Sequence, residues 1–426
     1  MSSANSTRTS ITRRTILAAA PVAATGIAVG TASSASAESD PTAAVLHWFD
    51  ATDAAVTAAP ASTQVTNSRT WAIAWLAAAR AVRRVPHGLN ASHYRDAALA
   101  AAVHRALYAL APSQTAALDA ALEEALAPIP DGRAKRKGVA AGVERADALL
   151  NDRVGDGLDP ASVSPAYTPP AAAPGVWQPT PPAFGPAQQA GTRFAVPFAL
   201  DSADQFRLEP PPAIGTPQYR ADLEEVKAYG ALNGSARTQE QTDTAQFWLG
   251  SSFTLYNPVL RAALEHHAGS LRDQVELVAL FHVASVDTQI ATSDSKYAHV
   301  WWRPVTAIAG EVEDGDPATE RDPSWAPLHA TPSHPDYPSG HNTYSGSAEE
   351  VLTQLVGDGP GAAFTIPSPT APGVTRTYTT WHPLTTENVD ARVWSGIHSR
   401  SADLAGVELS RAVAAHVLSR AGDLLA

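Results

Sequence analysis

The sequence predicts an all-α protein of two helical bundles, and three observations support this fold class. Residues from about 41 to 153 are rich in Ala and Leu at helical spacing, as in 94–110, where apolar residues recur at steps of three and four. Alternation of polar and apolar residues, which is typical of strands, is nearly absent. Helical patterns return after about residue 218. We therefore expect about ten to twelve helices, arranged as bundles.

The composition excludes several classes of protein. The chain has 426 residues, of which 44% are hydrophobic and 17% charged, so it can form a substantial core. It contains no Cys, which excludes a disulfide framework, a thiolate nucleophile, an iron–sulfur cluster and a Cys-ligated zinc site. The formal net charge of −12 argues against a nucleic-acid-binding protein, which would need a basic surface. Because the whole chain is acidic, an anion-binding site must be formed by Lys and Arg side chains that lie close together.

Residues 1–37 predict a twin-arginine signal peptide. Thr12–Leu17 holds two adjacent arginines, an apolar run follows over 16–29, and Ala35–Ala37 has the small-residue pattern of a cleavage site. The run is shorter than the roughly 20 residues of a spanning helix. We expect export by the twin-arginine route and a secreted or extracytoplasmic product without stable membrane insertion. A short amphipathic N-terminal helix is the alternative.

The exported chain divides into three parts: an N-terminal helical bundle over 38–155, an irregular segment over 156–218, and a C-terminal helical bundle over 219–426 that carries the functional site. Between Pro160 and Pro217 lie 14 of the 34 prolines, which excludes regular helix there. A flexible linker is the alternative. Five aromatic residues favour instead a segment anchored on the body of the protein: Trp177, Phe184, Phe194, Phe198 and Phe206.

Four helices are expected after residue 218. Thr238 and Gln241 have the spacing of a capping box, which opens a helix over 239–249 that ends at Gly250. A long helical stretch runs from 271 to about 302. Further helices are expected over 342–356 and 403–425.

Lys296 and Arg303 form the first of three informative segments. On a continuous helix seven residues turn 700°, so the two cations would share one face two turns apart. Two cations on one face repel each other unless an anion lies between them. The alternative is a solvated basic face on which each cation pairs separately with an acid.

The second segment runs from His334 to His341 and leads into the expected helix. A Pro-Ser-Gly turn before a helix presents free backbone N–H groups and the Ser339 hydroxyl at the positive end of that helix. Gly340 permits close approach of an oxyanion to the backbone. The alternative is an ordinary turn with an N-terminal cap.

Arg392 and His398 form the third segment. On a continuous helix they would point about 240° apart, but a break at Ser395-Gly396 would let both turn inward. The alternative is a helix end with a surface Arg and His. Jointly, the three segments supply three cations, a hydroxyl, a backbone N–H and two imidazoles, which is a set that binds a tetrahedral oxyanion.

The pattern Lys296-x6-Arg303-Pro304, Pro338-Ser339-Gly340-His341, Arg392-x5-His398 resembles the signature of the superfamily of vanadium-dependent haloperoxidases and type-2 phosphatidic-acid-phosphatase-like acid phosphatases. The likeness in composition extends over about 41–420. Two positions depart from the phosphatase pattern: Ala391 stands where it has Ser, and Asp403 lies five residues after His398 rather than four.

The resemblance implies two four-helix bundles with vanadate, or phosphate in the same site, held in the second. His398 would be the vanadium ligand, or the nucleophile of a phosphatase, and His341 would be the acid–base group. As a peroxidase, Lys296 would also polarise hydrogen peroxide. The oxyanion would be held by five residues besides His398: Lys296, Arg303, Ser339, Gly340 and Arg392.

Haloperoxidase activity is the favoured function, and phosphatase activity through a phosphohistidine is the alternative. His334 lies seven residues before His341, where bromoperoxidases of the family carry a second histidine and chloroperoxidases carry Phe. The resemblance therefore implies oxidation of halide, with bromide favoured, by hydrogen peroxide to a hypohalous species that halogenates small organic acceptors. A homodimer is also compatible with the sequence.

Two other classes of protein stay open. His334, Asp336 and His341 have ligand types that could form a divalent-metal site for hydrolysis, with each ligand about 2 Å from the metal. A non-catalytic secreted protein that binds an oxyanion is the second. Convergence of the cations and His398 on one pocket would favour an oxyanion site over a metal site.

Overall fold

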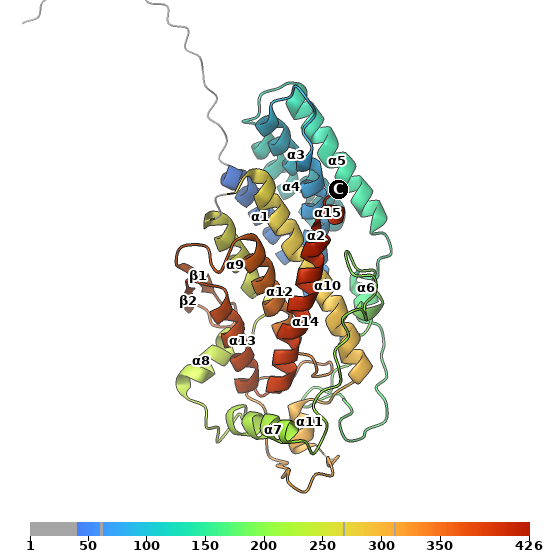
Figure 1. Ribbon diagram of the computed structural model, residues 1–426, viewed down its shortest axis with the longest axis vertical. Coiled ribbons are helices and arrows are strands. Elements are labelled where there is room, and N and C mark those ends of the chain that lie inside the picture. Colours follow the sequence, from blue (N-terminus) through green and yellow to red (C-terminus); the bar gives the residue numbers. More distant parts are fainter. Residues whose placement is uncertain (1–40, 60–62, 267–268, 311) are drawn as a thin grey trace, which may run out of the picture. The chain divides into compact units, whose positions relative to one another are not determined.

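The computed structural model describes residues 41–59, 63–266, 269–310 and 312–426, and these form one compact unit (Figure 1). The predicted signal peptide over 1–37 lies outside the described residues. The all-α fold class is confirmed, because the described residues form fifteen α-helices and a single two-stranded sheet. Among them, no helix has the combination of length and apolar composition that crossing a membrane requires.

The first part of the chain folds into helices with closely packed backbones. Alanine-rich α2 is buried along most of its length and packs on both α3 and α10. A Cβ on Gly138 would lie 2.3 Å from the carbonyl oxygen of Tyr94, and one on Gly142 would lie 2.5 Å from that of Ala98. Glycines one turn apart therefore let α5 contact the backbone of α3. The helices here are α1 (Pro41–Thr57), α2 (Gln64–Arg83), α3 (Ala91–Leu110), α4 (Thr115–Leu126), α5 (Arg133–Asp152) and α6 (Pro160–Val163), with the short 3-10 helix η1 (Pro112–Gln114).

A long irregular segment from 164 to 216 follows, with one 3-10 helix, η2 (Thr192–Phe194). Trp177 in this segment is fully buried and packs beside Tyr297, and Phe198 and Phe206 are partly buried against the core. Phe184 and Phe194, in contrast, are 63% and 72% exposed. The prediction that these two aromatic residues are anchors is wrong, because the segment turns their side chains to solvent.

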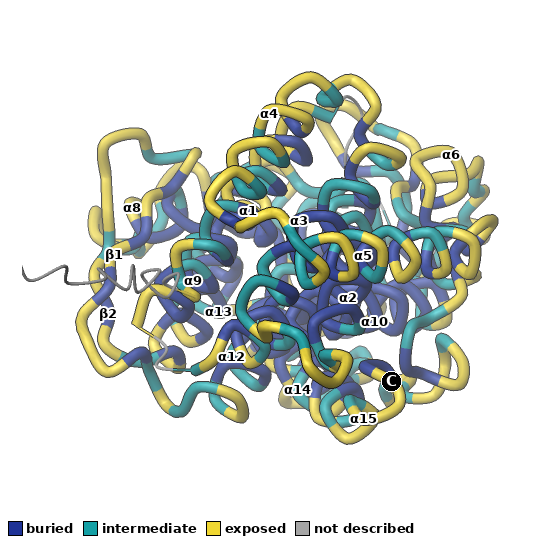
Figure 2. Tube along the Cα trace, turned by 90° about the horizontal axis from the view of Figure 1, so that it is seen from above, coloured by how far each residue is buried: buried dark blue, intermediate teal, exposed yellow. Residues whose placement is uncertain are grey.

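The central helix α10 (Leu271–His299) connects the core to the functional site. Ser270 and Asp273 form a capping box at its start, and its apolar first part packs on α2, α12 and α14. At 1.5 Å per residue its 29 residues span about 43 Å. Figure 2 shows α2 and α10 as the most continuously buried helices. The helix ends at His299 because Val300 takes a left-handed conformation with φ +49°.

The remaining elements belong to the second half of the chain, and two of them, α12 and α14, pack on α10. The expected capping box of Thr238 and Gln241 is confirmed, and its helix ends at Phe247. The helix expected over 403–425 begins earlier and is interrupted at Arg420. The elements are α7 (Pro217–Tyr229), α8 (Gln239–Phe247), α9 (Ser252–His266), α11 (Pro304–Ala309), α12 (Gly340–Leu355), β1 (Phe364–Pro367), β2 (Thr375–Tyr378), α13 (His382–Trp394), α14 (Arg400–Ser419) and α15 (Ala421–Leu424).

Candidate oxyanion site

The cations and His398 are brought together by the ends of helices. Lys296 lies in the last turn of α10, and Arg303 and Ser339 stand at the N-cap positions of α11 and α12. Arg392 lies in the last turn of α13, and His398 lies in the short link to α14. Each of the five is at most 5% exposed. The structure therefore gathers groups that the sequence spreads over about a hundred residues.

Lys296 and Arg303 meet by a route that differs from the predicted one. The two were expected to share one face of a continuous helix, but α10 ends before Arg303 is reached. The left-handed conformation of Val300 ends the helix, and Arg303 follows outside it, at the N-cap position of α11. Lys296 Nζ donates to the carbonyl oxygens of Pro335 (2.6 Å) and Asp336 (3.0 Å). Its stem passes Gly340, where a Cβ would lie 3.9 Å from Lys296 Cε.

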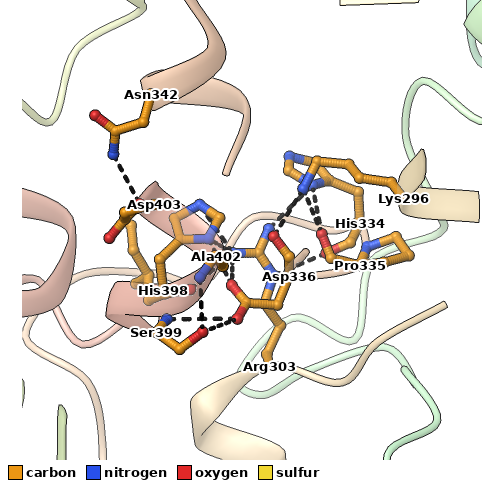
Figure 3. Close-up of polar contacts among 11 residues, drawn as sticks. Lys296, Arg303, His334, Pro335, Asp336, Asn342, His398, Ser399, Ala402 and Asp403 are labelled. Carbon is orange, nitrogen blue, oxygen red and sulfur yellow. Dashed lines mark hydrogen bonds and ion pairs between the residues drawn. The ribbon is translucent and has the colours of Figure 1, made fainter. Parts of the chain in front are cut away.

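Arg303 is the centre of the cluster (Figure 3). Its Nε donates to the carbonyl oxygen of His334 (2.8 Å), and its Nη1 donates to that of Ile397 (2.7 Å). Nη1 also lies 3.2 Å from His398 Nε2, and Nη2 lies 3.0 Å from His334 Nδ1. The Arg303 guanidinium therefore contacts the imidazoles of His334 and His398 and also the main-chain carbonyl oxygens of His334 and Ile397.

His398 is held by Asp336 and not by Asp403. The Nδ1 of His398 lies 2.5 Å from Asp336 Oδ1, while the carboxylate of Asp403 accepts from Asn342 Nδ2 at 2.7 Å. Asp336 Oδ2 accepts from the Ser399 hydroxyl at 3.0 Å. In the sequence Asp336 stood out only as a candidate metal ligand, and a spacing of 62 residues gives no signal for its pairing with His398.

Arg392 and His341 lie at the edge of this cluster. Arg392 Nη1 donates over 3.3 Å to the carbonyl oxygen of Trp248, and its buried Nε has no hydrogen-bond partner among the described residues. His341 Nε2 donates to the carbonyl oxygen of Gly250 at 3.0 Å. The unpaired Nε leaves Arg392 with donor capacity that a buried anion could use.

A cavity of about 80 Å³ opens next to these groups. Four predicted site residues line it, whereas Arg303, Ser339, Arg392 and His398 lie outside its lining. Most other lining side chains are neutral and polar, so the cavity suits a hydrated anion better than an apolar ligand. The full lining is Gln64, Gln188, Gln189, Gln289, Thr292, Ser293, Lys296, Tyr297, His334, Gly340, His341 and Thr343.

Burial controls the electrostatics of the site. It lowers the pKa of Arg303 and of Arg392 to about 10, and it lowers the pKa of Lys296 well below its usual range, with a further contribution from Arg303. Burial also raises the pKa of Asp336 to about 6 and the pKa of Asp403 well above its usual range.

The Lys and Arg side chains of the site have few close anionic partners. Their described contacts include one ion pair within the cluster, between Arg303 Nη1 and Asp336 Oδ1 at 3.6 Å. Lys296 and Arg392 donate instead to main-chain carbonyl oxygens. Buried cations of this kind require an anion or a shifted pKa. The residues present therefore fit a multiply charged oxyanion such as vanadate or phosphate.

The alternative divalent-metal site is not assembled in the structure. His334 Nδ1 faces Arg303, Asp336 faces His398 and Ser399, and His341 faces Gly250. Within the described ranges, no three side chains of His, Asp or Glu are grouped so that they could hold a metal ion.

Comparisons with known proteins show what the chain is similar to. Residues 276–426 match the family model of the VCPO second helical-bundle domain. A curated relative, vanadium chloroperoxidase from Curvularia inaequalis, is 28% identical over 188 residues, which are 36% of this chain and 30% of that protein. The match thus spans about a third of the length of that relative.

Solved structures extend the likeness to nearly the whole chain. A bacterial vanadium-dependent iodoperoxidase superposes with a TM-score of 0.68 at 23% identity, covering 88% of this chain and 95% of its own. A bacterial vanadium-dependent chloroperoxidase in its holo form gives a TM-score of 0.65 at 17% identity, covering 91% and 95%. Residues 276–426 are therefore similar to VCPO second helical-bundle domains, and the chain has the same fold as these two solved structures.

Proposed function

We propose that this chain is a secreted vanadate-dependent haloperoxidase, which oxidises halide with hydrogen peroxide to a hypohalous species that halogenates organic acceptors. The observation that carries the proposal is the convergence of three buried cations and His398. Among the described residues, only one of the three cations, Arg303, forms an ion pair with a carboxylate. The names of the similar proteins, a chloroperoxidase and an iodoperoxidase, support the same reaction class. Export would follow from the twin-arginine pattern of residues 1–37.

Vanadate, when bound, would supply a pentavalent Lewis acid that activates hydrogen peroxide without a change of oxidation state. The cations Lys296, Arg303 and Arg392 would neutralise its oxygens, as they would those of any tetrahedral oxyanion. Backbone N–H groups at Gly340 and the hydroxyl of Ser339 would donate hydrogen bonds at the start of α12.

The two imidazoles of the site would have different roles. His398 Nδ1 lies 2.5 Å from the Asp336 carboxylate, so Nε2 would be the basic nitrogen of the ring. His398 Nε2 would therefore be the vanadium ligand. His341 lines the cavity, where it would hold and exchange a proton. Burial lowers the pKa of His341 well below its usual range, with a further contribution from Arg392, so its neutral form predominates and can accept a proton.

Bromide is the halide that we propose, because His334 lies at the cavity wall with its Nδ1 3.0 Å from Arg303 Nη2. An imidazole there gives the wall a polar group that an aromatic hydrocarbon side chain would not supply. The relatives' names mention chloride and iodide oxidation, so the choice of bromide is the specific part of the proposal that needs measurement.

The test uses the chain without its signal, stripped of metal, with and without added orthovanadate. We expect orthovanadate to induce bromination of an organic acceptor in the presence of bromide and hydrogen peroxide, and His398→Ala to abolish it. His299→Ala is the matched control, because His299 Nε2 bonds to the carbonyl oxygen of Leu208 and not to the cluster. Hydrolysis of an aryl phosphate without bromination would identify a phosphatase instead. Tight oxyanion binding without either activity would identify a binding protein.

A further inference from the structure

Asp336 connects two groups of residues that the oxyanion site requires. Its side chain is 1% exposed, and both carboxylate oxygens have partners. Oδ1 accepts from His398 Nδ1 at 2.5 Å, and Oδ2 accepts from the Ser399 hydroxyl at 3.0 Å and from the Ser399 backbone N–H at 3.4 Å. The carboxylate thus holds two consecutive residues of the link between α13 and α14.

The main chain of Asp336 is fixed to the end of α10. Its N–H donates to the carbonyl oxygen of Trp301 at 2.9 Å, and its own carbonyl oxygen accepts from Lys296 Nζ at 3.0 Å. One residue therefore ties the cation of α10 to the imidazole that follows α13. Figure 3 shows Asp336 and Arg303 between Lys296 and His398, and both contact the His398 ring.

The bridge also selects the tautomer of His398. When Nδ1 carries the proton and donates it to a carboxylate, the lone pair is left on Nε2. Arg303 Nη1 lies 3.2 Å from this Nε2 and 3.4 Å from Nδ1, so the guanidinium lies beside the ring and close to both of its nitrogens. A carboxylate that orients an imidazole in this way increases its basicity and fixes its ring plane.

We propose that Asp336 is the positioning residue for His398, which it holds as the Nδ1–H tautomer with Nε2 directed at the oxyanion. This inference rests on the proposed function, since it assigns Nε2 the role of ligand. Asp403, the nearest acid after His398 in the sequence, does not have this role, because its carboxylate accepts from Asn342.

Removing the negative charge of Asp336 changes anion affinity in opposite directions if the residue positions His398 and if it acts only through its charge. A carboxylate beside an anion site repels the anion, so neutralising it would tighten binding if charge were its only contribution. Loss of a positioning group has the opposite effect, because the imidazole is no longer held in place. Asp336→Asn keeps the shape of the side chain and removes the charge. Asp403→Asn is the matched control, since it neutralises a second buried carboxylate near the site, which accepts from Asn342 and whose charge acts on Arg392.

The experiment measures binding of orthovanadate and of orthophosphate by calorimetry to the metal-free full chain without its signal. We expect Asp336→Asn to weaken binding of both by about 10- to 100-fold. Asp403→Asn should leave binding unchanged or make it tighter. Equal or tighter binding by Asp336→Asn would overturn the positioning role.

Nitrogen NMR of ¹⁵N-histidine-labelled protein gives a readout that needs no activity and no variant of Asp336. In the wild type, the His398 signals, assigned by their loss in His398→Gln, should show a proton on Nδ1 and a bare Nε2. A proton on Nε2 instead would overturn the inference even if Asp336→Asn failed to fold. If the wild type binds neither oxyanion, the proposed function fails. If the wild type binds vanadate but His398 carries its proton on Nε2, only the positioning role of Asp336 fails.

Discussion

The carbonyl oxygen of Gly230 lies only 2.4 Å from the position that a Cβ on Gly396 would occupy. Gly396 takes φ +76°, directly after α13 ends, and it separates Arg392 from His398. This confirms the break in the helix that the sequence predicted at Ser395-Gly396. Both the positive φ and the contact with the end of α7 require a residue without a side chain.

Gly396→Ala should therefore disturb the site as well as the fold. We expect a loss of about 3 kcal/mol or more in the free energy of unfolding, because strain at positive φ adds to a backbone clash. Phosphate affinity measured by calorimetry should fall with it. Gly155→Ala is the control: Gly155 has φ +69°, but a Cβ there would meet no atom within 4 Å, so only about 1 kcal/mol should be lost. Equal losses in the two variants would show that the contact with Gly230 is unimportant.

Asp287 should be essential for holding the irregular segment on α10. Its carboxylate accepts the backbone N–H groups of Phe198 (2.7 Å), Ala199 (2.7 Å) and Leu200 (3.1 Å). Asp287→Asn turns one acceptor oxygen into a donor that faces an N–H, so we expect a loss of about 2–3 kcal/mol in the free energy of unfolding and faster proteolysis within 164–216.

Asp294→Asn is the comparison on the same helix. Asp294 pairs with Arg207, whose side chain is 44% exposed, so the loss should be at most about 1 kcal/mol. If Asp294→Asn lowered the free energy of unfolding more than Asp287→Asn, this ranking of the two carboxylates would be wrong.

His282 makes stability depend on pH at a position away from the site. The ring is fully buried and stacks on Trp71 at 4.6 Å between centroids. Within the part of the chain that the structure describes, neither ring nitrogen has a hydrogen-bond partner. Burial alone lowers its pKa to about 3. The unfolded chain therefore binds a proton near pH 6.5 that the folded chain does not, so stability falls as pH decreases from about 6.5 towards 3.

His282→Phe should remove this dependence. At pH 5 the proton linkage of His282 costs about 2 kcal/mol, so the difference in unfolding free energy between variant and wild type should grow by that amount between about pH 8 and pH 5. Chemical denaturation at both pH values measures it. A constant difference would mean that His282 is protonated in the folded protein.

His334→Ala should affect halide oxidation more than vanadate uptake. The variant leaves the main-chain contact of Arg303 with residue 334 intact and removes only the ring contact at 3.0 Å. We expect kcat/KM for bromide to fall about tenfold or more, the value of one hydrogen bond to a charged group, with a smaller change in the dissociation constant of vanadate. His334→Gln, which retains an acceptor for Arg303, should lose less. Parallel losses in both quantities would argue against a special role in halide oxidation.

Much of the fold could be predicted from local sequence signals. The capping box at Thr238 and the Ala-rich spacing of 94–110 are determined by neighbouring residues, and α8 and α3 follow them. The end of α10 could not be predicted, because a β-branched Val at φ +49° has no local preference for that conformation and is held there by its surroundings. The exposure of Phe184 and Phe194 was missed for the same reason, since only the tertiary path of the segment decides which ring is buried.

In the candidate site, likewise, the residue types could be predicted from the sequence but their contacts could not. The identities of Lys296, Arg303 and Arg392 indicated an oxyanion, and the structure buries all three together. Their hydrogen bonds to main-chain carbonyl oxygens and the bridge from Asp336 to His398 involve residues that are distant in sequence. Pairings of that kind depend on how helix ends meet, and spacing along the chain does not contain that information.

The length of α10 limits how this protein can be divided. The matched family region begins at residue 276, inside the helix, whose buried surface is completed by α2 from the opposite end of the sequence. A fragment beginning at residue 219 would display the valine and leucine side chains that α2 normally covers, and it would aggregate during expression. Recombinant work on the anion pocket therefore requires the intact polypeptide, and gene fusions or circular permutations should place new termini in exposed loops away from that helix pair.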